Sequence, residues 1–435
     1  MDDQTTTIST SDEALKNSPK SWKIRTLGNV AEKIGDGLHG TPKYSSDGQY
    51  YFVNGNNIED GKIVIKADTK KVDKKEYIKH KKELGGNTIL LSINGTIGNL
   101  AKYKNEKCIL GKSAAYINVN NENDQDFIYY LMLDNRFQRD ISKNANGSTI
   151  KNVSLAQLRN YKFLLPLLSE QRAIAAVLNS LDNKIELLRT QNRTLENIAQ
   201  LIFKYWFVNF EFPNKNGESY KSNGGKTMDS ELGEIPNGWK IGKLGEVTEV
   251  RGGTTPSTEI ADYWNGNIHW TSPKDLSNSR EMFLLDTEKK ITEKGLSQIG
   301  SGLLPKGTLL LSSRAPIGYL AIANIPVAIN QGYIALLPGS KFSTFYTYLW
   351  LKKYMREIIS AANGSTFLEI SKGSFKKISC VIPEEKILDD FQAVITPIFK
   401  KILLNILQIK TLSKMRDTVL PKLMKGEVRV KSLKD

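Results

Sequence analysis

The chain has 435 residues, 40% of them hydrophobic and 25% charged, so it is long enough for two or three domains with their own cores and is neither disordered nor fibrous. Lys and Arg number 61 against 46 Asp and Glu, and the net charge of +15 favours a polyanionic partner, most commonly nucleic acid. The two cysteines have no metal-site spacing and exclude a disulfide framework, which favours buried thiols in a reducing cytosol.

Residues 1–20 contain no apolar segment of the kind that a secretory signal needs, and we expect a disordered tail there. No uninterrupted apolar run approaches the roughly 18 residues of a membrane helix. The expected location is therefore the cytoplasm, without membrane contact.

Residues 21–165 are expected to form a first globule. Short β-like runs at 50–53, 88–93 and 114–119 are separated by Gly, Asn and Asp, and a helix is predicted over 127–143, ended by the Asn-Gly-Ser-Thr turn at 146–149. Strands and helices mixed without regular alternation indicate an α+β fold.

Residues 166–209, which begin at a proline, are predicted to form a long central helix. From Ile174 to Trp206 the apolar positions follow steps of four and three residues, which is the heptad seam of a coiled coil, and Asn192 is its polar member. A helix of about 38 residues would span roughly 57 Å and act as a spacer.

A polar, Gly-rich stretch, residues 210–235, reads as a linker, and beyond it the chain repeats itself. Residues 22–28 return as 239–245 and residues 145–149 return as 362–366, both with an offset of 217. The second globule, 236–382, is accordingly predicted to have strands at 309–313 and 333–337 and a helix over 344–360.

Residues 383–428 form the predicted second spacer helix, whose heptad seam matches the first. If the two helices pack antiparallel with Ile174 beside Leu423, Asn192 lies opposite Asn405, and a buried Asn pair fixes register at a cost in stability. Pro397 must kink this helix or mark a restart after Thr396. The predicted architecture is two similar α+β globules separated by two long antiparallel coiled-coil helices, with pseudo-twofold symmetry from the internal duplication.

Familiar catalytic patterns are missing from the sequence. Residues 111–113 and 225–227 mimic the end of a phosphate-binding loop but lack its first glycine, and three histidines leave little material for a metal centre or a Ser-His-Asp system. We expect no catalytic residue and no metal site on this chain.

Several motifs carry a family resemblance. Residues 229–239, the Gly-Thr-Thr-Pro-Ser of 253–257 followed by Ile-His-Trp-Thr at 268–271, and the Glu-Gln-Arg of 170–172 after Pro166 resemble the specificity subunit of type I restriction-modification enzymes. The second helix departs from this pattern with Glu385-Lys386 where Glu-Gln is usual in the first helix, and residues 39–60 match less closely than 253–276.

The resemblance implies that residues 21–165 and 236–382 are target-recognition domains, each reading one half of a split site on double-stranded DNA. It also implies that the helices dock two modification (methyltransferase) subunits and that restriction (translocase and nuclease) subunits join them. S-adenosylmethionine, ATP and Mg would belong to those partner subunits, and this chain would carry no cofactor. Two related heads on an antiparallel rod should read inversely related half-sites about one helical turn apart, and because the heads differ in sequence the site should be asymmetric.

Polar and basic residues in Gly-rich loops are the candidate DNA contacts, because Arg and Lys suit guanine, Asn and Gln suit adenine, and Ser or Thr contact bases more loosely. The candidates are Lys43, Tyr44, Asn54, Asn56, Asn57, Asn94, Lys112, Arg251, Thr254, Thr255, Lys274, Arg314 and Gln331. Two alternatives compete with this interpretation: a coiled-coil adaptor whose heads bind protein or glycan, and a DNA-modifying enzyme with an unrecognised site.

Overall fold

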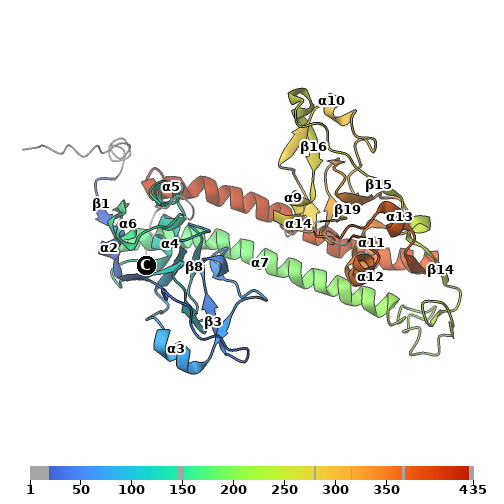
Figure 1. The fold of residues 1–435 in the computed structure, drawn as a ribbon, viewed down its shortest axis with the longest axis horizontal. Coiled ribbons are helices and arrows are strands. Elements are labelled where there is room, and N and C mark those ends of the chain that lie inside the picture. Colours follow the sequence, from blue (N-terminus) through green and yellow to red (C-terminus); the bar gives the residue numbers. More distant parts are fainter. Residues whose placement is uncertain (1–18, 146–150, 279–280, 315, 365–367, 431–435) are drawn as a thin grey trace, which may run out of the picture. The chain divides into compact units, whose positions relative to one another are not determined.

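The computed structural model describes residues 19–145, 151–278, 281–314, 316–364 and 368–430, and Figure 1 shows the course of the chain. The predicted tail and the turn at 146–149 fall largely or wholly outside these residues. Contacts divide the chain into two compact units. Unit 1 comprises Met1–Ile185 and Thr411–Asp435, and unit 2 comprises Glu186–Lys410.

Unit 1 is built on a four-stranded antiparallel sheet. All side chains of its two inner strands are buried, because the sheet is covered on both faces. A three-stranded sheet, a hairpin and a strand pair complete the unit. In sheet order the strands are β2 (Ala31–Asp36), β10 (Ala114–Val119), β7 (Thr88–Ser92) and β8 (Leu100–Lys102); then β6 (Lys71–Val72), β3 (Tyr50–Val53) and β9 (Cys108–Leu110); then β4 (Ile58–Glu59) with β5 (Lys62–Ile63); and β1 (Lys23–Thr26) with β11 (Lys162–Leu165).

Helices pack on these sheets, and one of them differs from the prediction. The helix predicted over 127–143 is two helices, because Asp134 takes an extended backbone conformation (φ −61°, ψ 139°) and its carboxylate accepts the Arg136 N–H at 2.8 Å as an N-cap. The short helical elements of unit 1 are α2 (Leu27–Val30), η1 (Gly55–Asn57), α3 (Lys74–His80), α4 (Gln125–Leu133), α5 (Asn135–Lys143) and α6 (Leu155–Asn160).

Unit 2 repeats this plan with one added strand. Its main sheet has five strands because β17 pairs in parallel beside β20. The strands are β15 (Val250–Gly252), β22 (Tyr333–Leu336), β19 (Leu309–Ser312), β20 (Leu320–Ala323) and β17 (Phe283–Leu284); then β18 (Lys289–Ile291), β16 (Trp264–Thr271) and β21 (Ala328–Ile329); and β14 (Lys240–Lys243) with β23 (Ser379–Ile382).

The helix predicted over 344–360 is also two helices, and the break falls at Tyr354. The helical elements around the sheets of unit 2 are α8 (Leu244–Val247), η2 (Ala261–Tyr263), α9 (Pro273–Asn278), α10 (Glu293–Leu296), α11 (Thr344–Lys353), α12 (Met355–Ser360) and α13 (Lys372–Lys376).

The internal duplication holds at the level of individual hydrogen bonds. Lys23 of β1 pairs with Leu165 of β11, and Lys240 of β14 pairs with Ile382 of β23, so both members are displaced by 217. The Leu27 N–H donates to the Tyr161 carbonyl at 3.0 Å, and 217 residues later Leu244 repeats the bond with Ile378 at 3.0 Å. The predicted pair of similar globules is confirmed.

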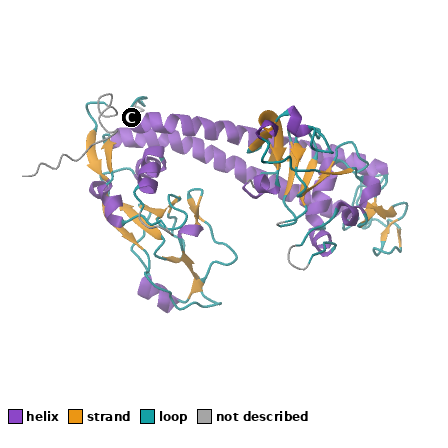
Figure 2. Ribbon diagram, turned by 45° about the horizontal axis from the view of Figure 1, so that its top comes forward, coloured by secondary structure: helices purple, strands orange, loops and turns teal. Residues whose placement is uncertain are grey.

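Two long helices begin two residues after the prolines predicted to precede them. They are α7 (Leu168–Phe207) and α14 (Glu385–Lys425), and in each unit their segments lie side by side (Figure 2). The helix α14 does not restart at Pro397, because it is continuous from Glu385 to Lys425. Beside the proline, the Thr396 hydroxyl donates to the Gln392 carbonyl at 2.6 Å.

The predicted linker is packed against unit 2. Phe212 is buried and stacks on Tyr220 and Trp239, with ring centroids 4.5 Å and 5.1 Å apart. A small hairpin, β12 (Thr227–Met228) with β13 (Ile235–Pro236), follows. The polar composition of the segment hid these aromatic anchors, by which the linker packs on the core of unit 2.

One described helix, α14, is long and apolar enough to cross a membrane by length and composition alone. Its apolar stripe is instead a core element. Phe391, Ile395, Phe399 and Ile402 are buried within unit 2, whose hydrophobic core they help to form.

Candidate nucleic-acid interface

In unit 1 two loops cross so closely that only glycine fits. The Leu38 N–H donates to the Leu110 carbonyl at 2.7 Å, and the Lys112 N–H returns a bond to the Leu38 carbonyl at 3.0 Å. A Cβ placed on Gly37 would overlap the Leu110 carbonyl. This crossing places the exposed side chain of Lys112 beside the loop that follows β2.

A serine joins the next loops to the same place. The Ser113 hydroxyl accepts the Gly55 N–H at 2.9 Å and donates to the Asn54 carboxamide oxygen at 3.1 Å, while its carbonyl accepts the Ile93 N–H at 2.9 Å. The structure therefore gathers Asn54, Asn56, Asn94 and Lys112, of which Asn56 and Lys112 are exposed.

Three candidate DNA contacts of the first globule do not belong to this group of loop residues. Asn57 is only 4% exposed, and its side chain holds the loop by donating to the Val64 carbonyl and the Thr69 hydroxyl, both at 3.0 Å. A base cannot reach it without breaking these bonds, so we remove it from the contact set. Lys43 and Tyr44 are exposed but lie toward α3, where the Lys43 N–H donates to Glu76 at 3.1 Å.

Unit 2 repeats the glycine crossing. The Thr254 N–H donates to the Ile329 carbonyl at 3.1 Å, and a Cβ on Gly253 would overlap that same carbonyl. Beside the crossing, the Thr255 hydroxyl donates to the Gln331 carboxamide oxygen at 2.7 Å at the surface. A hydroxyl and an amide are thus offered on the backbone arrangement that presents Lys112 in unit 1.

The cationic candidates of unit 2 are ion-paired. Arg251 pairs with Glu249, Lys274 contacts Glu288 at 3.2 Å, and Arg314 contacts Glu369 at 3.5 Å. Exposed pairs of this kind are worth about 0–1 kcal/mol, so a DNA phosphate can displace the carboxylate at little cost. The Arg314 loop is fixed by backbone bonds from Ser313 to Gly332 and from Ile370 to Ser313.

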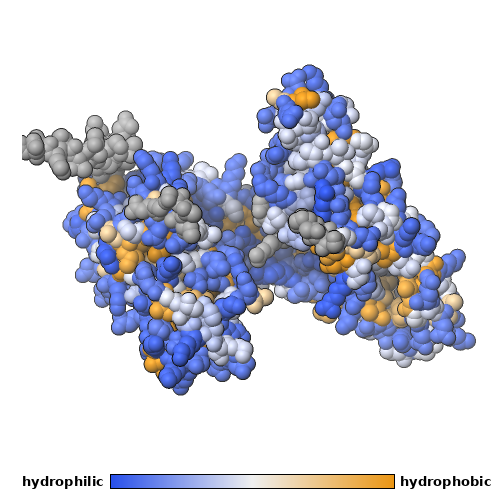
Figure 3. Space-filling model, in the orientation of Figure 1, coloured by the Kyte–Doolittle hydropathy of each residue, from blue (hydrophilic) through white to orange (hydrophobic). Residues whose placement is uncertain are grey.

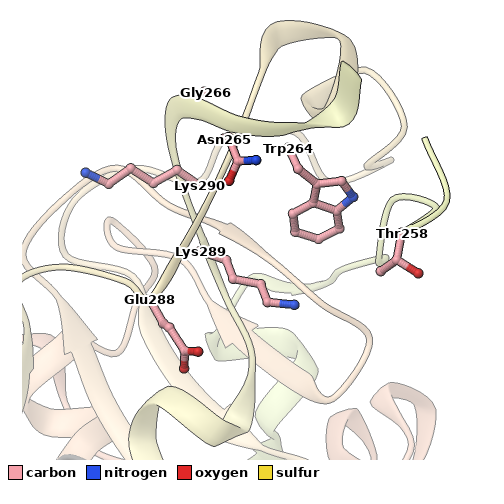
Figure 4. Close-up of a pocket in the computed structure, with 7 residues that line it drawn as sticks. All are labelled: Thr258, Trp264, Asn265, Gly266, Glu288, Lys289 and Lys290. Carbon is pink, nitrogen blue, oxygen red and sulfur yellow. The ribbon is translucent and has the colours of Figure 1, made fainter. Parts of the chain in front are cut away.

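An open pocket of about 460 Å³ lies at the N-terminal end of β16. Figure 4 shows its lining side chains, among which the Lys289 ammonium lies 5.2 Å from the centroid of the Trp264 ring. Asn265, the next lining residue, has a positive φ of 60°. Sequence reasoning did not single out this pocket, whose charged lining residues are Glu288, Lys289 and Lys290.

The two predicted seam asparagines meet within unit 2. The Asn405 Nδ2 donates to the Asn192 Oδ1 at 2.9 Å, and Asn405 is 1% exposed. Farther along, the rings of Trp206 and Phe391 lie 5.5 Å apart. The helices are therefore antiparallel in this unit, in the predicted register.

In unit 1 a polar contact, missed from the sequence, interrupts the apolar seam. Arg416 donates to Asp182 at 2.9 Å, and the Tyr130 hydroxyl of α4 donates to the other carboxylate oxygen at 2.8 Å. Burial, followed by the charge of Asp182, raises the pKa of Tyr130, so its proton stays in this bond at neutral pH. The sequence contained one indication of this contact, because Arg416 is a charged residue at an apolar position of the heptad seam.

Both cysteines are buried, as predicted. Cys108 is 4% exposed and Cys380 is 1% exposed. Burial raises the pKa of each thiol to about 12, so neither is a thiolate at neutral pH. Within the described ranges no group of three His, Cys, Asp or Glu side chains is arranged to hold a metal ion.

Comparison with known proteins finds the same two repeats. A model of the type I restriction modification DNA specificity domain matches residues 19–197 and again 236–414. The chain is similar to the MjaIX specificity subunit of Methanocaldococcus jannaschii, with 40% identity over 157 residues, but this match spans only 36% of the chain and 36% of that protein. It is also similar to the HindI specificity subunit of Haemophilus influenzae, with 25% identity over 360 residues, 70% of the chain and 77% of that subunit.

A solved structure has the same fold. The S subunit of a type I restriction-modification system from M. genitalium matches with a TM-score of 0.54 and 18% identity, over 94% of this chain and 96% of that one. The two family matches begin and end 217 residues apart, so each repeat comprises a globule and most of its long helix.

Proposed function

Because the chain belongs to the type I restriction modification DNA specificity domain family, we propose that it is the DNA-recognition subunit of a type I restriction-modification complex. Each globule reads one half of a bipartite site in double-stranded DNA. The site is asymmetric, since the two globules share a fold but differ in their loop side chains.

The duplicated glycine crossing carries this proposal. Gly37 and Gly253 allow the same close backbone approach, and the loops around them present Asn56 and Lys112 in one unit but Thr255 and Gln331 in the other. Amide side chains suit adenine, lysine suits guanine or phosphate, and threonine is more permissive. One scaffold with two sets of readers is what two unlike half-sites require.

The long helices set the spacing and dock two modification subunits. Each of α7 and α14 is uninterrupted and contributes to both units. Leu187, Leu201 and Leu404 are 51%, 64% and 61% exposed, which is apolar surface available to a partner.

The chemistry belongs to the other subunits of the complex. S-adenosylmethionine is the expected methyl donor on the modification subunits, and ATP and Mg²⁺ are expected where restriction subunits translocate and cut. This chain is non-catalytic and works in the cytoplasm, where its buried thiols remain reduced.

Methylation mapping of the source genome tests the proposal. An interrupted motif whose methylation disappears when this gene is deleted supports it, and replacement of residues 236–382 by another second globule should change one half of that motif only. A genome without such a motif, or a swap that changes both halves, would contradict it.

The spacer role has a separate test. Removal of seven residues from each helix shortens it by about 10.5 Å, so the unread gap should shrink by about 3 base pairs. An unchanged gap would contradict this role. Methylation or cleavage by the purified chain alone would favour the enzyme alternative, whereas salt-resistant binding to protein or glycan without DNA affinity would favour the adaptor.

A further inference from the structure

The helix α3 of unit 1 carries an unusual density of uncompensated positive charge. Residues 70–82 contain seven lysines and two acidic residues, which gives +5 over 13 positions. Five of these lysines are exposed, and none of the five forms an ion pair with another residue that the structure describes. They are Lys70, Lys74, Lys75, Lys79 and Lys81.

The acidic side chains of the same segment are turned to structural use. The Asp73 carboxylate caps α3 by accepting the Glu76 N–H at 2.8 Å. Glu76 is 8% exposed, accepts the Lys43 N–H at 3.1 Å and faces His80 at 3.5 Å. The outward surface of the helix is therefore mainly cationic, although it also carries Ile78, which is 56% exposed.

The helix has a firm base. The ring of Tyr77 stacks on that of Tyr50 of β3, with centroids 4.0 Å apart. Within unit 1, α3 lies at the end away from the long helices, as Figures 1 and 2 agree, and Figure 3 shows mostly hydrophilic side chains at that end. A rigid cationic face is thus presented beyond the β3 sheet.

Unit 2 does not repeat this surface. Residues 288–300, which hold the corresponding strand and helix, contain three lysines and two acidic residues, a balance of +1. These lysines are also engaged: Lys294 pairs with Asp262 at 2.9 Å, Lys290 lies 3.9 Å from Asp286, and Lys289 lies against Trp264. The difference between the units is one of local charge and of ion pairing.

We propose that α3 of unit 1 binds the DNA phosphate backbone and anchors this globule without reading sequence. The inference rests on the proposed function. Lysine is a mobile point charge suited to phosphate, and phosphate contacts supply affinity and orientation, whereas base-edge contacts supply specificity. No ion pair has to be broken for these lysines to engage, in contrast to the paired cations of unit 2.

The test replaces Lys74, Lys75, Lys79 and Lys81 by Gln in the full chain, assembled with its modification subunits. The matched control replaces four exposed lysines of unit 2 by Gln, which removes the same charge. They are Lys215, Lys221, Lys226 and Lys240. Affinity is measured against salt concentration for a duplex carrying the mapped motif and for a scrambled duplex of the same length.

Each phosphate contact contributes about 0.9 to the slope of log affinity against log salt. We expect the α3 variant to lose about 2 to 4 from that slope on both duplexes, with an unchanged ratio between them, and the control to lose less than about 1.

Three results would overturn the inference. An α3 variant with the slope of the control would do so while leaving the proposed function intact, as would an altered ratio between the two duplexes. An α3 variant that keeps its DNA affinity but no longer retains the modification subunits would assign the surface to a protein partner. If the unsubstituted complex binds neither duplex, the proposed function itself is wrong.

Discussion

Substitution of the seam asparagines should have unequal effects, because the two amides are unequally buried. Asn405 is 1% exposed, whereas Asn192 is half-buried and within reach of water. In the Asn192→Leu variant, the Asn405 Nδ2 loses its acceptor at 2.9 Å and retains only Gln191, at 3.4 Å. A buried polar group left unsatisfied costs about 1–3 kcal/mol.

Asn405→Leu should cost less. The Asn405 Oδ1 has no hydrogen-bond partner among the described residues, so this variant removes an imperfectly paired buried amide and leaves Asn192 to water. We expect the free energy of unfolding to fall by less than about 1 kcal/mol. The double Leu variant should be close to the unsubstituted chain in stability, because neither amide is left buried and unpaired.

Hydrogen exchange read by mass spectrometry is the suitable assay, since a chain of two units need not unfold in one step. In peptides covering residues 188–206 and 391–409, Asn192→Leu should lower protection by about 5-fold to about 140-fold. The double variant should recover most of it. Unchanged protection in Asn192→Leu, or less protection in the double variant than in that single variant, would refute the reasoning.

Three further predictions concern other sites. In the Gly253→Ala variant the new Cβ would overlap the opposing backbone carbonyl. The variant should bind the motif duplex at least about tenfold more weakly and scrambled DNA with unchanged affinity. Affinity for the motif duplex equal to that of the unsubstituted chain would contradict this prediction. Arg416→Met should lower the unfolding free energy of unit 1 by about 1–2 kcal/mol, because Asp182, itself about a quarter exposed, is left without its cation. Hydrogen exchange in residues 174–182 measures this loss, and unaltered exchange would show that the pair contributes nothing. Burial raises the pKa of the Cys108 and Cys380 thiols to about 12, so both should resist a thiol reagent at pH 8 in the native protein. Both should react after unfolding in guanidinium, as mass spectrometry would show. Labelling of either cysteine in the native protein would be inconsistent with the fold.

The long helices were predictable because a heptad seam specifies a face, a register and a partner at once. The spacing of apolar residues alone predicts that Asn192 lies opposite Asn405, and the two amides are bonded. The duplication added a second, independent copy of the same pattern. Periodicity was sufficient here because helix packing depends on spacing more than on individual side chains.

The interruptions of the shorter helices were not predictable in the same way. Asp134 is tolerated inside a helix or as an N-cap, and tertiary contacts decide between the two. Asn57 shows the same limit for the recognition loops, because its burial depends on where Val64 and Thr69 come to lie. The lysines of α3 form a local concentration of charge, which the net charge of the whole chain does not reveal.

The assignment of helix segments to the two units has a consequence for how the gene can be divided. Leu420 and Leu423, encoded by the second repeat, complete the core around the first globule, while Phe203 and Trp206, encoded by the first repeat, complete the core around the second. Cutting the gene between its repeats would therefore yield fragments that each leave an apolar seam uncovered. Two copies of one fragment could cover each other's seams by exchange, giving a homodimer with identical heads, and such a homodimer would select a palindrome.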